Sequence, residues 1–226
     1  MAAPHSHSSA APPPPLDSNP DIEDETLLRT ARAARRKLSM FKRRSPQVAE
    51  VGMNWHVEFI AGLARIMRPR VYVELGIYQA EVFNKVAPHA GEAFGVDIDP
   101  ACARFVRETP NSRFVSGTTD SFADYFRKLG RQIDMLFIDA DHCRESVLRD
   151  FRNYLPLVSP HGLILMHDTH PGDASLVEPG YCCDAYKAVE ELQANPVGYE
   201  MMTIPLSPGL TICRKRTAQL AWMEPL

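Results

Sequence analysis

The sequence predicts an α/β protein built on a doubly wound, mostly parallel sheet of seven strands. Short apolar runs alternate with amphipathic helical segments from residue 71 onward, which is typical of βαβ units. Four of these runs end at a carboxylate, namely Glu74, Asp97, Asp139 and Asp168. In an open parallel sheet the carboxyl ends of the strands line the ligand crevice, so we expect these four side chains at one functional edge.

The chain is expected to have three parts. Residues 1–20 are rich in Ala, Pro and Ser and predict a disordered tail, because they offer little apolar surface to bury. Residues 21–67 predict an N-terminal helical arm with a basic stretch at 24–44, and residues 68–226 hold the sheet domain. Strands are expected at 71–75, 93–97, 113–115, 133–138 and 162–166, and helices at 79–87, 100–108, 120–129, 144–155 and 183–193. The runs 199–204 and 210–213 flank a Pro/Gly turn and predict a hairpin that adds an antiparallel C-terminal strand.

Composition excludes several classes of function. A formal net charge of -3 gives no overall basic field, which disfavours nucleic acid as the main partner. No stretch approaches the roughly 18 apolar residues of a membrane span. The five cysteines are odd in number and lack CxxC spacing, which favours a reducing, cytoplasmic setting. The basic arm is expected to dock on the domain or on a second subunit, which makes a homodimer plausible; phosphate or lipid binding is the alternative.

The first two strand ends indicate an adenosine-type ligand. Gly76 follows Glu74 in a tight turn from strand to helix, where a glycine lets the backbone approach a ligand closely. The turn lacks a GxGxxG pattern, which argues against a nicotinamide cofactor. Asp97 follows about 20 residues later, where an acidic side chain can accept hydrogen bonds from ribose hydroxyls. The turn at 116–120 is suited either to capping a helix or to holding a purine edge.

The last two strand ends indicate a cation site. Asp139 and Asp168 end strands that are separated by one helix, and carboxylates at neighbouring strand ends offer the hard oxygen ligands that Mg²⁺ prefers. The alternative is that each caps a helix or turn. His142 is a candidate general base or else a surface histidine, and His167 is expected to pack or to orient a ligand residue. His56 has no such setting and is expected to be structural. The long link from Thr169 to Cys182 is expected to form a lid or a substrate wall.

Together these residues resemble the class I S-adenosylmethionine-dependent methyltransferases, specifically the metal-dependent O-methyltransferases of the catechol type and of the sugar- and antibiotic-tailoring type. The resemblance covers about residues 50–214 and implies a Rossmann-like fold. It places Glu74, Gly76 and Tyr78 beside the methionine part of the cofactor and Asp97 on its ribose. It places Thr118, Thr119 and Asp120 on the adenine side.

The resemblance also implies a metal site and a reaction. Asp139 and Asp168 match metal ligands, and Thr169 stands at a third ligand position; Asp139 also faces the cofactor. The spacing of Asp139 and His142 looks like that of the tailoring branch, in which this histidine is a proposed base. The implied reaction is Mg²⁺-assisted methyl transfer to a hydroxyl of a small molecule of sugar or natural-product type.

Two departures from the family's pattern leave alternatives open. Ala80 replaces the usual glycine, and Val82 replaces a small hydroxyl residue. One alternative is a catalytically inactive, methyltransferase-like scaffold that binds a partner. The other is a metal-independent methyltransferase in which His142 alone is the base.

Overall fold

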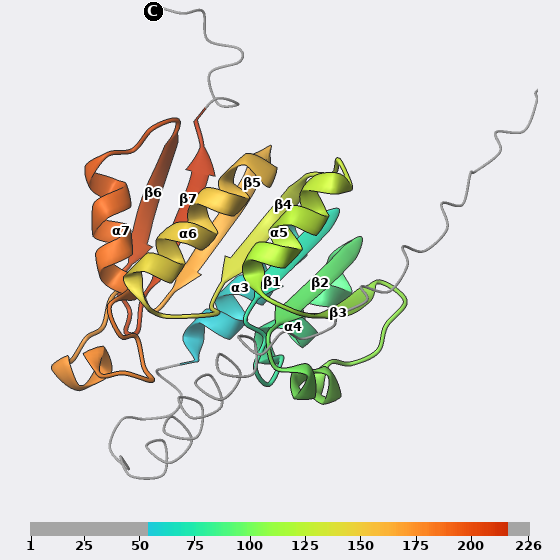
Figure 1. Ribbon diagram of the computed structural model, residues 1–226, viewed down its shortest axis with the longest axis horizontal. Helices are drawn as coiled ribbons and strands as arrows, with labels where there is room; N and C mark the ends of the chain where they lie inside the picture. Colours follow the sequence, from blue (N-terminus) through green and yellow to red (C-terminus); the bar gives the residue numbers. More distant parts are fainter. Residues whose placement is uncertain (1–53, 217–226) are drawn as a thin grey trace, which may run out of the picture.

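A twisted sheet of seven strands forms the centre of the protein, as the computed structural model of residues 54–216 shows (Figure 1). The predicted tail and the basic stretch of the predicted arm lie outside the described residues. The strand order is β3-β2-β1-β4-β5-β7-β6, and β7 runs antiparallel to both of its neighbours. The strands are β1 (Val71–Leu75), β2 (Glu92–Asp97), β3 (Ser112–Ser116), β4 (Ile133–Ile138), β5 (Val158–His167), β6 (Tyr199–Ile204) and β7 (Leu210–Lys215). The predicted fold class and its antiparallel C-terminal strand are confirmed.

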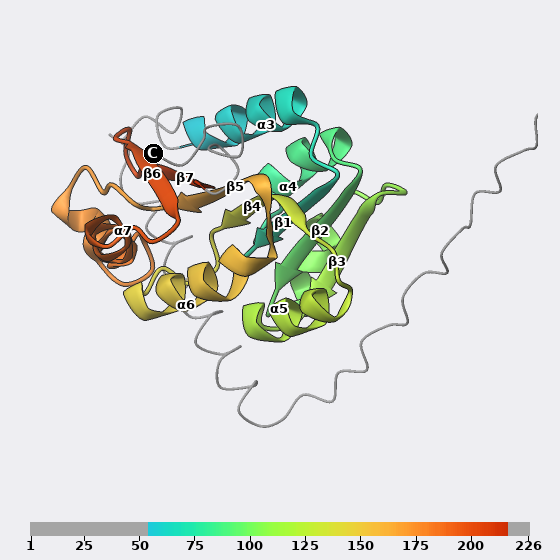
Figure 2. The same cartoon turned by 90° about the horizontal axis from the view of Figure 1, so that it is seen from above.

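Helices cover both faces of the sheet (Figure 2). On one face lie α3 (Trp55–Met67) and α4 (Glu81–Val86), which contact each other. On the other face lie α5 (Thr119–Lys128), α6 (Arg144–Tyr154) and α7 (Ala185–Ala194). Short 3-10 turns occupy Ala87–His89, Pro100–Phe105, Leu155–Leu157 and Ala174–Val177. No helix between residues 54 and 216 is long and apolar enough to cross a bilayer.

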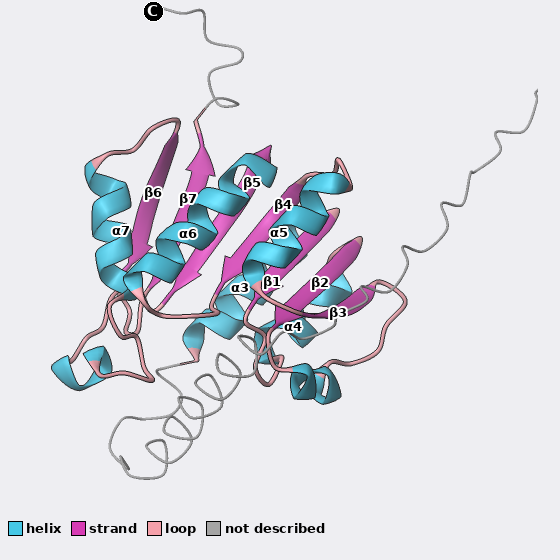
Figure 3. Cartoon of the chain, in the orientation of Figure 1, coloured by secondary structure: helices cyan, strands magenta, loops and turns pink. Residues whose placement is uncertain are grey.

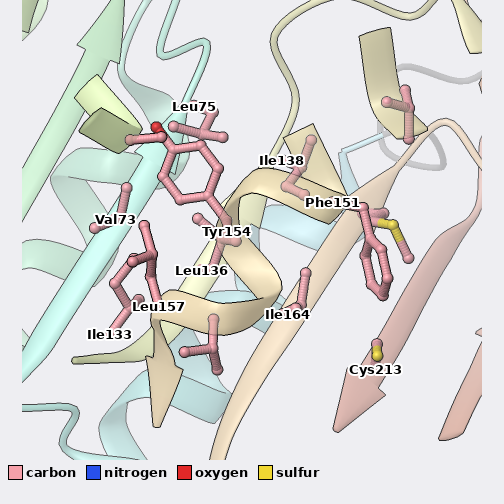
Figure 4. Packing of buried hydrophobic residues seen from close by; sticks show 14 of the residues in the cluster. Val73, Leu75, Ile133, Leu136, Ile138, Phe151, Tyr154, Leu157, Ile164 and Cys213 are labelled. Carbon is pink, nitrogen blue, oxygen red and sulfur yellow. The ribbon is translucent and has the colours of Figure 1, made fainter. Parts of the chain in front are cut away.

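The strands β1, β2 and β4 read as largely apolar runs because both of their faces are buried. Val73 and Leu75 of β1 lie near Tyr154 of α6, and Phe151 of the same helix lies near Ile164 of β5 (Figure 4). Tyr72, which alternates with Val73 along β1, belongs to the opposite core layer, together with buried residues of α3. The last helix of the predicted arm therefore packs onto the sheet and helps to cover the strands that carry the candidate site.

Two elements differ from the prediction. The helix expected at 100–108 is a 3-10 turn over Pro100–Phe105. Asn84 ends it, because its Nδ2 donates to Phe105 O at 2.8 Å and its Oδ1 accepts from Arg107 N at 2.8 Å. The fifth strand begins at Val158, four residues before the expected start, directly after a 3-10 turn that contains Pro156.

Candidate active site

The four acidic strand ends lie at one edge of the sheet because β2, β1, β4 and β5 are parallel and adjacent (Figure 3). Backbone hydrogen bonds continue past the strands at this edge. Gly76 N donates to Val96 O at 2.8 Å, and Asp139 N donates to Leu75 O at 2.9 Å. The turns that carry the acidic side chains are therefore fastened to one another.

Gly76 is required by the neighbouring loop. Its φ is +84°, and a Cβ there would lie 2.4 Å from both Ala140 Cα and Asp139 O. The space beside this glycine is thus filled by backbone of the loop after β4. Tyr78 and Ala80 also have positive φ, 44° and 57°, so Ala80 holds a left-handed conformation that a glycine would adopt more easily.

Asp97 holds two turns together. It is 3% exposed, its Oδ2 accepts from Tyr78 N at 3.1 Å, and its Oδ1 accepts from Asp99 N at 2.9 Å. Asp99 in turn caps the following 3-10 turn by accepting from Ala101 N at 3.0 Å. Asp97 therefore places the backbone of Tyr78 beside the end of β2, and its proposed contact with a ribose stays a prediction.

Glu74 is a carboxyl in an environment that disfavours its negative charge. It is 2% exposed, and Tyr72 Oη donates to Glu74 Oε2 at 2.5 Å. Burial raises the pKa of Glu74 well above its usual range; the Tyr72 hydrogen bond opposes this shift, and the charge of Asp139 adds to it. A positively charged ligand at this edge would stabilise the ionised form.

The turn after β3 serves the packing of two helices. Thr118 Oγ1 accepts from Ser121 N at 3.1 Å and caps α5. Thr119 Oγ1 donates to Asp150 Oδ1 at 2.6 Å, and Asp120 Oδ1 accepts from Asn153 Nδ2 at 2.6 Å. Of the two roles considered from sequence, helix capping is therefore observed for Thr118, and the purine contact stays a prediction for all three residues.

The loop after β4 brings His142 between two carboxylates. His142 Nδ1 lies 2.8 Å from Asp168 Oδ2, and its Nε2 lies 3.4 Å from Asp139 Oδ1. One potential ligand atom from each of these residues lies within 4.8 Å of the others, and across residues 54–216 no second group of this kind occurs among His, Cys, Asp and Glu. Asp168 is buried and has φ +59°, which turns the chain sharply at the end of β5. The predicted cluster is thus brought together.

His167 and His56 extend this cluster. His167 Nδ1 lies 3.0 Å from Asp139 Oδ1 and 3.4 Å from Asp168 Oδ1, so it can orient both carboxylates. The ring of His56, on α3, lies 3.9 Å from the ring of His167, centroid to centroid. His167 Nε2 is buried and has no hydrogen-bond partner within the described part of the chain. His56 was expected to be purely structural, and only the placement of α3 over the end of β5 shows its proximity to the site.

Imidazoles and carboxylates at this site stabilise each other's charged forms. Burial lowers the pKa of His142, but Asp168 and Asp139 outweigh it and raise that pKa well above its usual value. The pKa of His167 is raised for the same reasons, again against the effect of burial. Burial raises the pKa of Asp139, and the two imidazoles more than reverse that shift. A cation bound by the carboxylates would compete with these protons.

Thr169 and Cys182 are buried beside Asp168. Thr169 Oγ1 accepts from Thr211 Oγ1 at 2.9 Å, which ties it to β7. Its role as a third metal ligand stays a prediction. Cys182 Sγ donates to Asp168 Oδ1 at 3.4 Å, so this thiol packs against a carboxylate and acts as a donor.

A cavity of about 700 Å³ adjoins the cluster at Thr169. Its walls come from the loop at 169–177, from α7 and from Thr203 at the end of β6. The predicted link after β5 therefore forms one wall of a cavity. Glu74, Gly76 and Asp97 are not among the lining residues, so this space is distinct from the turns assigned to the cofactor.

Comparisons with known proteins bear on the fold of this chain. Residues 73–169 match the family model of a methyltransferase domain. No curated protein matches the sequence. The O-methyltransferase TomG of Streptomyces achromogenes, which is involved in tomaymycin synthesis and was crystallised with SAM, has a TM-score of 0.60 at 16% identity, covering 88% of this chain and 92% of its own.

Two further solved structures are similar to the same extent. The SAH-bound methyltransferase PaMTH1 of Podospora anserina has a TM-score of 0.59 at 16% identity, covering 89% of this chain and 100% of its own. A putative caffeoyl-CoA O-methyltransferase from Staphylococcus aureus has a TM-score of 0.58 at 17% identity, covering 86% and 100%. The chain thus has the Rossmann-like methyltransferase fold, and residues 73–169 are similar to a methyltransferase domain.

Proposed function

We propose that this protein transfers the methyl group of S-adenosylmethionine to a hydroxyl oxygen of a small molecule, with Mg²⁺ or a similar cation held by Asp139 and Asp168. The observation that carries this proposal is the gathering of four acidic strand ends at one edge of a methyltransferase sheet, two of them grouped with His142 within 4.8 Å. The cofactor brings a sulfonium and an ammonium charge, and the acceptor site would bring a dication. Both match an acidic edge.

Glu74 and Asp97 supply the cofactor half of the proposal. Burial and the nearby Asp139 raise the pKa of Glu74 in spite of its hydrogen bond from Tyr72, and a cationic ligand would offset this shift. Asp97 is the acceptor for ribose hydroxyls, and Gly76 and Tyr78 form the turn beside the methionine part. Thr118, Thr119 and Asp120 form the adenine side.

The donors at the metal half fit a divalent cation. Two carboxylates supply hard oxygen ligands, and their spacing with His142 is close to that of ligands around one ion. Thr169 is the proposed third ligand position. Such a cation would lower the pKa of an acceptor hydroxyl and hold it near the methyl donor.

His142 is the proposed general base. Asp168 and the carbonyl of Tyr181, 2.5 Å from Nδ1, hold the ring in place, while Nε2 faces Asp139. As the acceptor oxygen forms its bond to the methyl carbon, the bond from carbon to sulfur breaks and leaves S-adenosylhomocysteine; the hydroxyl proton passes to His142. His167 orients Asp139 through their 3.0 Å contact. Positioning of the two reactants would supply much of the rate.

The test combines binding and turnover. We expect S-adenosylmethionine to bind in calorimetry, and we expect both chelation and Asp168→Ala to abolish methyl transfer with little change in cofactor affinity. Asp124→Ala, which removes an exposed carboxylate on α5, is the control and should retain activity. If S-adenosylmethionine does not bind, either with or without Mg²⁺, this would contradict the proposed enzymatic activity and favour the catalytically inactive scaffold.

A metal-independent methyltransferase is the second candidate. The 2.8 Å contact between His142 Nδ1 and Asp168 is by itself the geometry of a base oriented by a carboxylate. In that case chelation would leave the rate unchanged, whereas His142→Gln would still abolish it.

A further inference from the structure

The cavity beside Thr169 has the volume of a small-molecule site. At about 700 Å³ it falls within the range of roughly 300–1,000 Å³ that such sites occupy. One of its lining residues, Thr169, directly follows Asp168, which belongs to the cluster with His142. The loop that follows β5 and carries the 3-10 turn Ala174–Val177 lies beyond the end of β6, below α7 (Figure 1). An acceptor held in this cavity would contact Thr169, the residue that follows the proposed metal ligand Asp168 in the chain.

The ionisable side chains that line the cavity are mostly acidic. Asp173 comes from the loop and Glu190 from α7, and the one basic residue of the lining is His170, with no Lys or Arg. Asp173 Oδ1 accepts from Ser175 N at 2.7 Å, and these hydrogen bonds lower the pKa of its carboxyl and keep it ionised. Lys187, next to Tyr186 on α7, lies 3.9 Å from Asp184 and outside the lining.

The uncharged part of the lining suits a hydroxylated ring. Tyr186 offers an aromatic ring, and Gln193 and Thr203 offer an amide and a hydroxyl that can pair with hydroxyl groups. Ala174, Val177 and Val189 supply apolar surface between them. Such a mixture of one aromatic ring, a few polar groups and apolar walls is common where a ligand's orientation has to be set.

From this lining we infer that the methyl acceptor is a polyhydroxylated amine, whose ammonium group pairs with Asp173 and Glu190 while its ring lies against Tyr186. The inference rests on the proposed function and names the acceptor class for the same site. It disfavours anionic acceptors such as phosphorylated sugars and coenzyme A thioesters, because two carboxylates would repel them and His170 is the one basic residue of the lining.

Three ring compounds of similar size but different charge test the inference. 2-Deoxystreptamine is cationic, myo-inositol is neutral and myo-inositol 1-phosphate is anionic. Binding of each to the full chain is measured by calorimetry with S-adenosylhomocysteine and Mg²⁺ present. We expect 2-deoxystreptamine to bind at least about tenfold more tightly than myo-inositol, with an affinity that falls as salt is added, and myo-inositol 1-phosphate to bind most weakly.

Charge-neutralising variants locate the effect in the cavity. Glu190→Gln and Asp173→Asn should each reduce the preference for 2-deoxystreptamine by about fivefold or less, the range of a partly exposed ion pair, and the double variant should remove it. Glu108→Gln makes the same charge change at an exposed residue outside the cavity and should leave the preference intact. Because Glu190 and Asp173 are exposed, these substitutions are expected to leave the fold unchanged.

Failure of the inference and failure of the proposed function are distinguishable. Equal or tighter binding of the anionic compound, no detectable binding of 2-deoxystreptamine, or a preference unchanged in the double variant would each overturn the acceptor class, and cofactor binding would be unaffected. If S-adenosylmethionine does not bind, the proposed function fails, while the charge preference of the cavity can still be measured.

Discussion

Replacing Gly76 with alanine should destabilise the protein more than the same replacement at Gly130 or Gly62. The added Cβ would lie 2.4 Å from Ala140 Cα and Asp139 O and 2.7 Å from Ala140 N. All three are backbone atoms, which cannot move aside as a side chain can. A φ of +84° costs a residue with a Cβ about 1–2 kcal/mol, and overpacking costs about 1–3 kcal/mol. We therefore expect Gly76→Ala to lower the free energy of unfolding by about 2–5 kcal/mol.

Two other glycines separate these contributions. Gly130 has φ +61° but nothing within 4 Å of an added Cβ, so Gly130→Ala should show only the cost of the backbone conformation, about 1–2 kcal/mol. Gly62 lies inside α3 and also has nothing within 4 Å of an added Cβ, so Gly62→Ala should stabilise the protein by up to about 1 kcal/mol.

Urea unfolding of the three variants and the wild type gives the comparison. The clash with the loop after β4 is the difference between Gly76→Ala and Gly130→Ala, and we expect it to exceed about 1 kcal/mol. Because relief of the clash would displace Asp139, we also expect Gly76→Ala to weaken Mg²⁺ binding. If Gly76→Ala were no more destabilising than Gly130→Ala, the close approach of the two turns would be refuted.

Three further predictions concern buried ionisable groups. Burial raises the pKa of Asp150 to about 6, so its carboxyl stabilises the fold while protonated and loses that contribution as pH rises through about 6. Asp150→Asn, which can still accept from Thr119, should therefore raise stability by about 1–3 kcal/mol at pH 7.5 and by little at pH 4, as measured by urea unfolding. Binding of S-adenosylmethionine should release protons, because its positive charge would lower the raised pKa of Glu74; equal calorimetric heats in buffers of different ionisation enthalpy would argue against this. His167→Leu should reduce kcat with little change in cofactor affinity, and His167→Asn, which keeps a donor toward Asp139, should recover part of the loss.

The sheet could be predicted from the sequence because its strands β1, β2 and β4 are buried on both faces and read as largely apolar runs. Their acidic ends could be predicted with them, since the edge of a parallel sheet follows from strand direction. The segment 100–108 could not, because the amide of Asn84 competes for the backbone groups that a longer helix would use. That competition depends on a residue from another element.

In the candidate site, too, some features could be predicted from the sequence and others depend on contacts between distant elements. Asp139, His142 and Asp168 were grouped from sequence because all three follow neighbouring strands, and the structure brings them together. His56 was missed, because its distance from His167 depends on how α3 crosses the sheet. No periodicity within α3 encodes that crossing. The sequence also could not show why residue 76 has to be a glycine, since the backbone that would clash with a Cβ there belongs to a loop more than 60 residues later in the chain.

The contacts at Gly76 and Asp97 join the cofactor half of the site to the metal half. Asp97 accepts from the backbone of Tyr78, Gly76 donates to the end of β2, and the loop that carries Asp139 packs against Gly76. A displacement on the cofactor side would therefore be transmitted to the metal ligands through backbone contacts. Methyl transfer requires the donor carbon and the acceptor oxygen to meet in line, and fixed spacing between the two halves supplies that alignment before the substrates bind. In the proposed reaction, the glycine after β1 would thus serve catalysis by holding two backbone turns together.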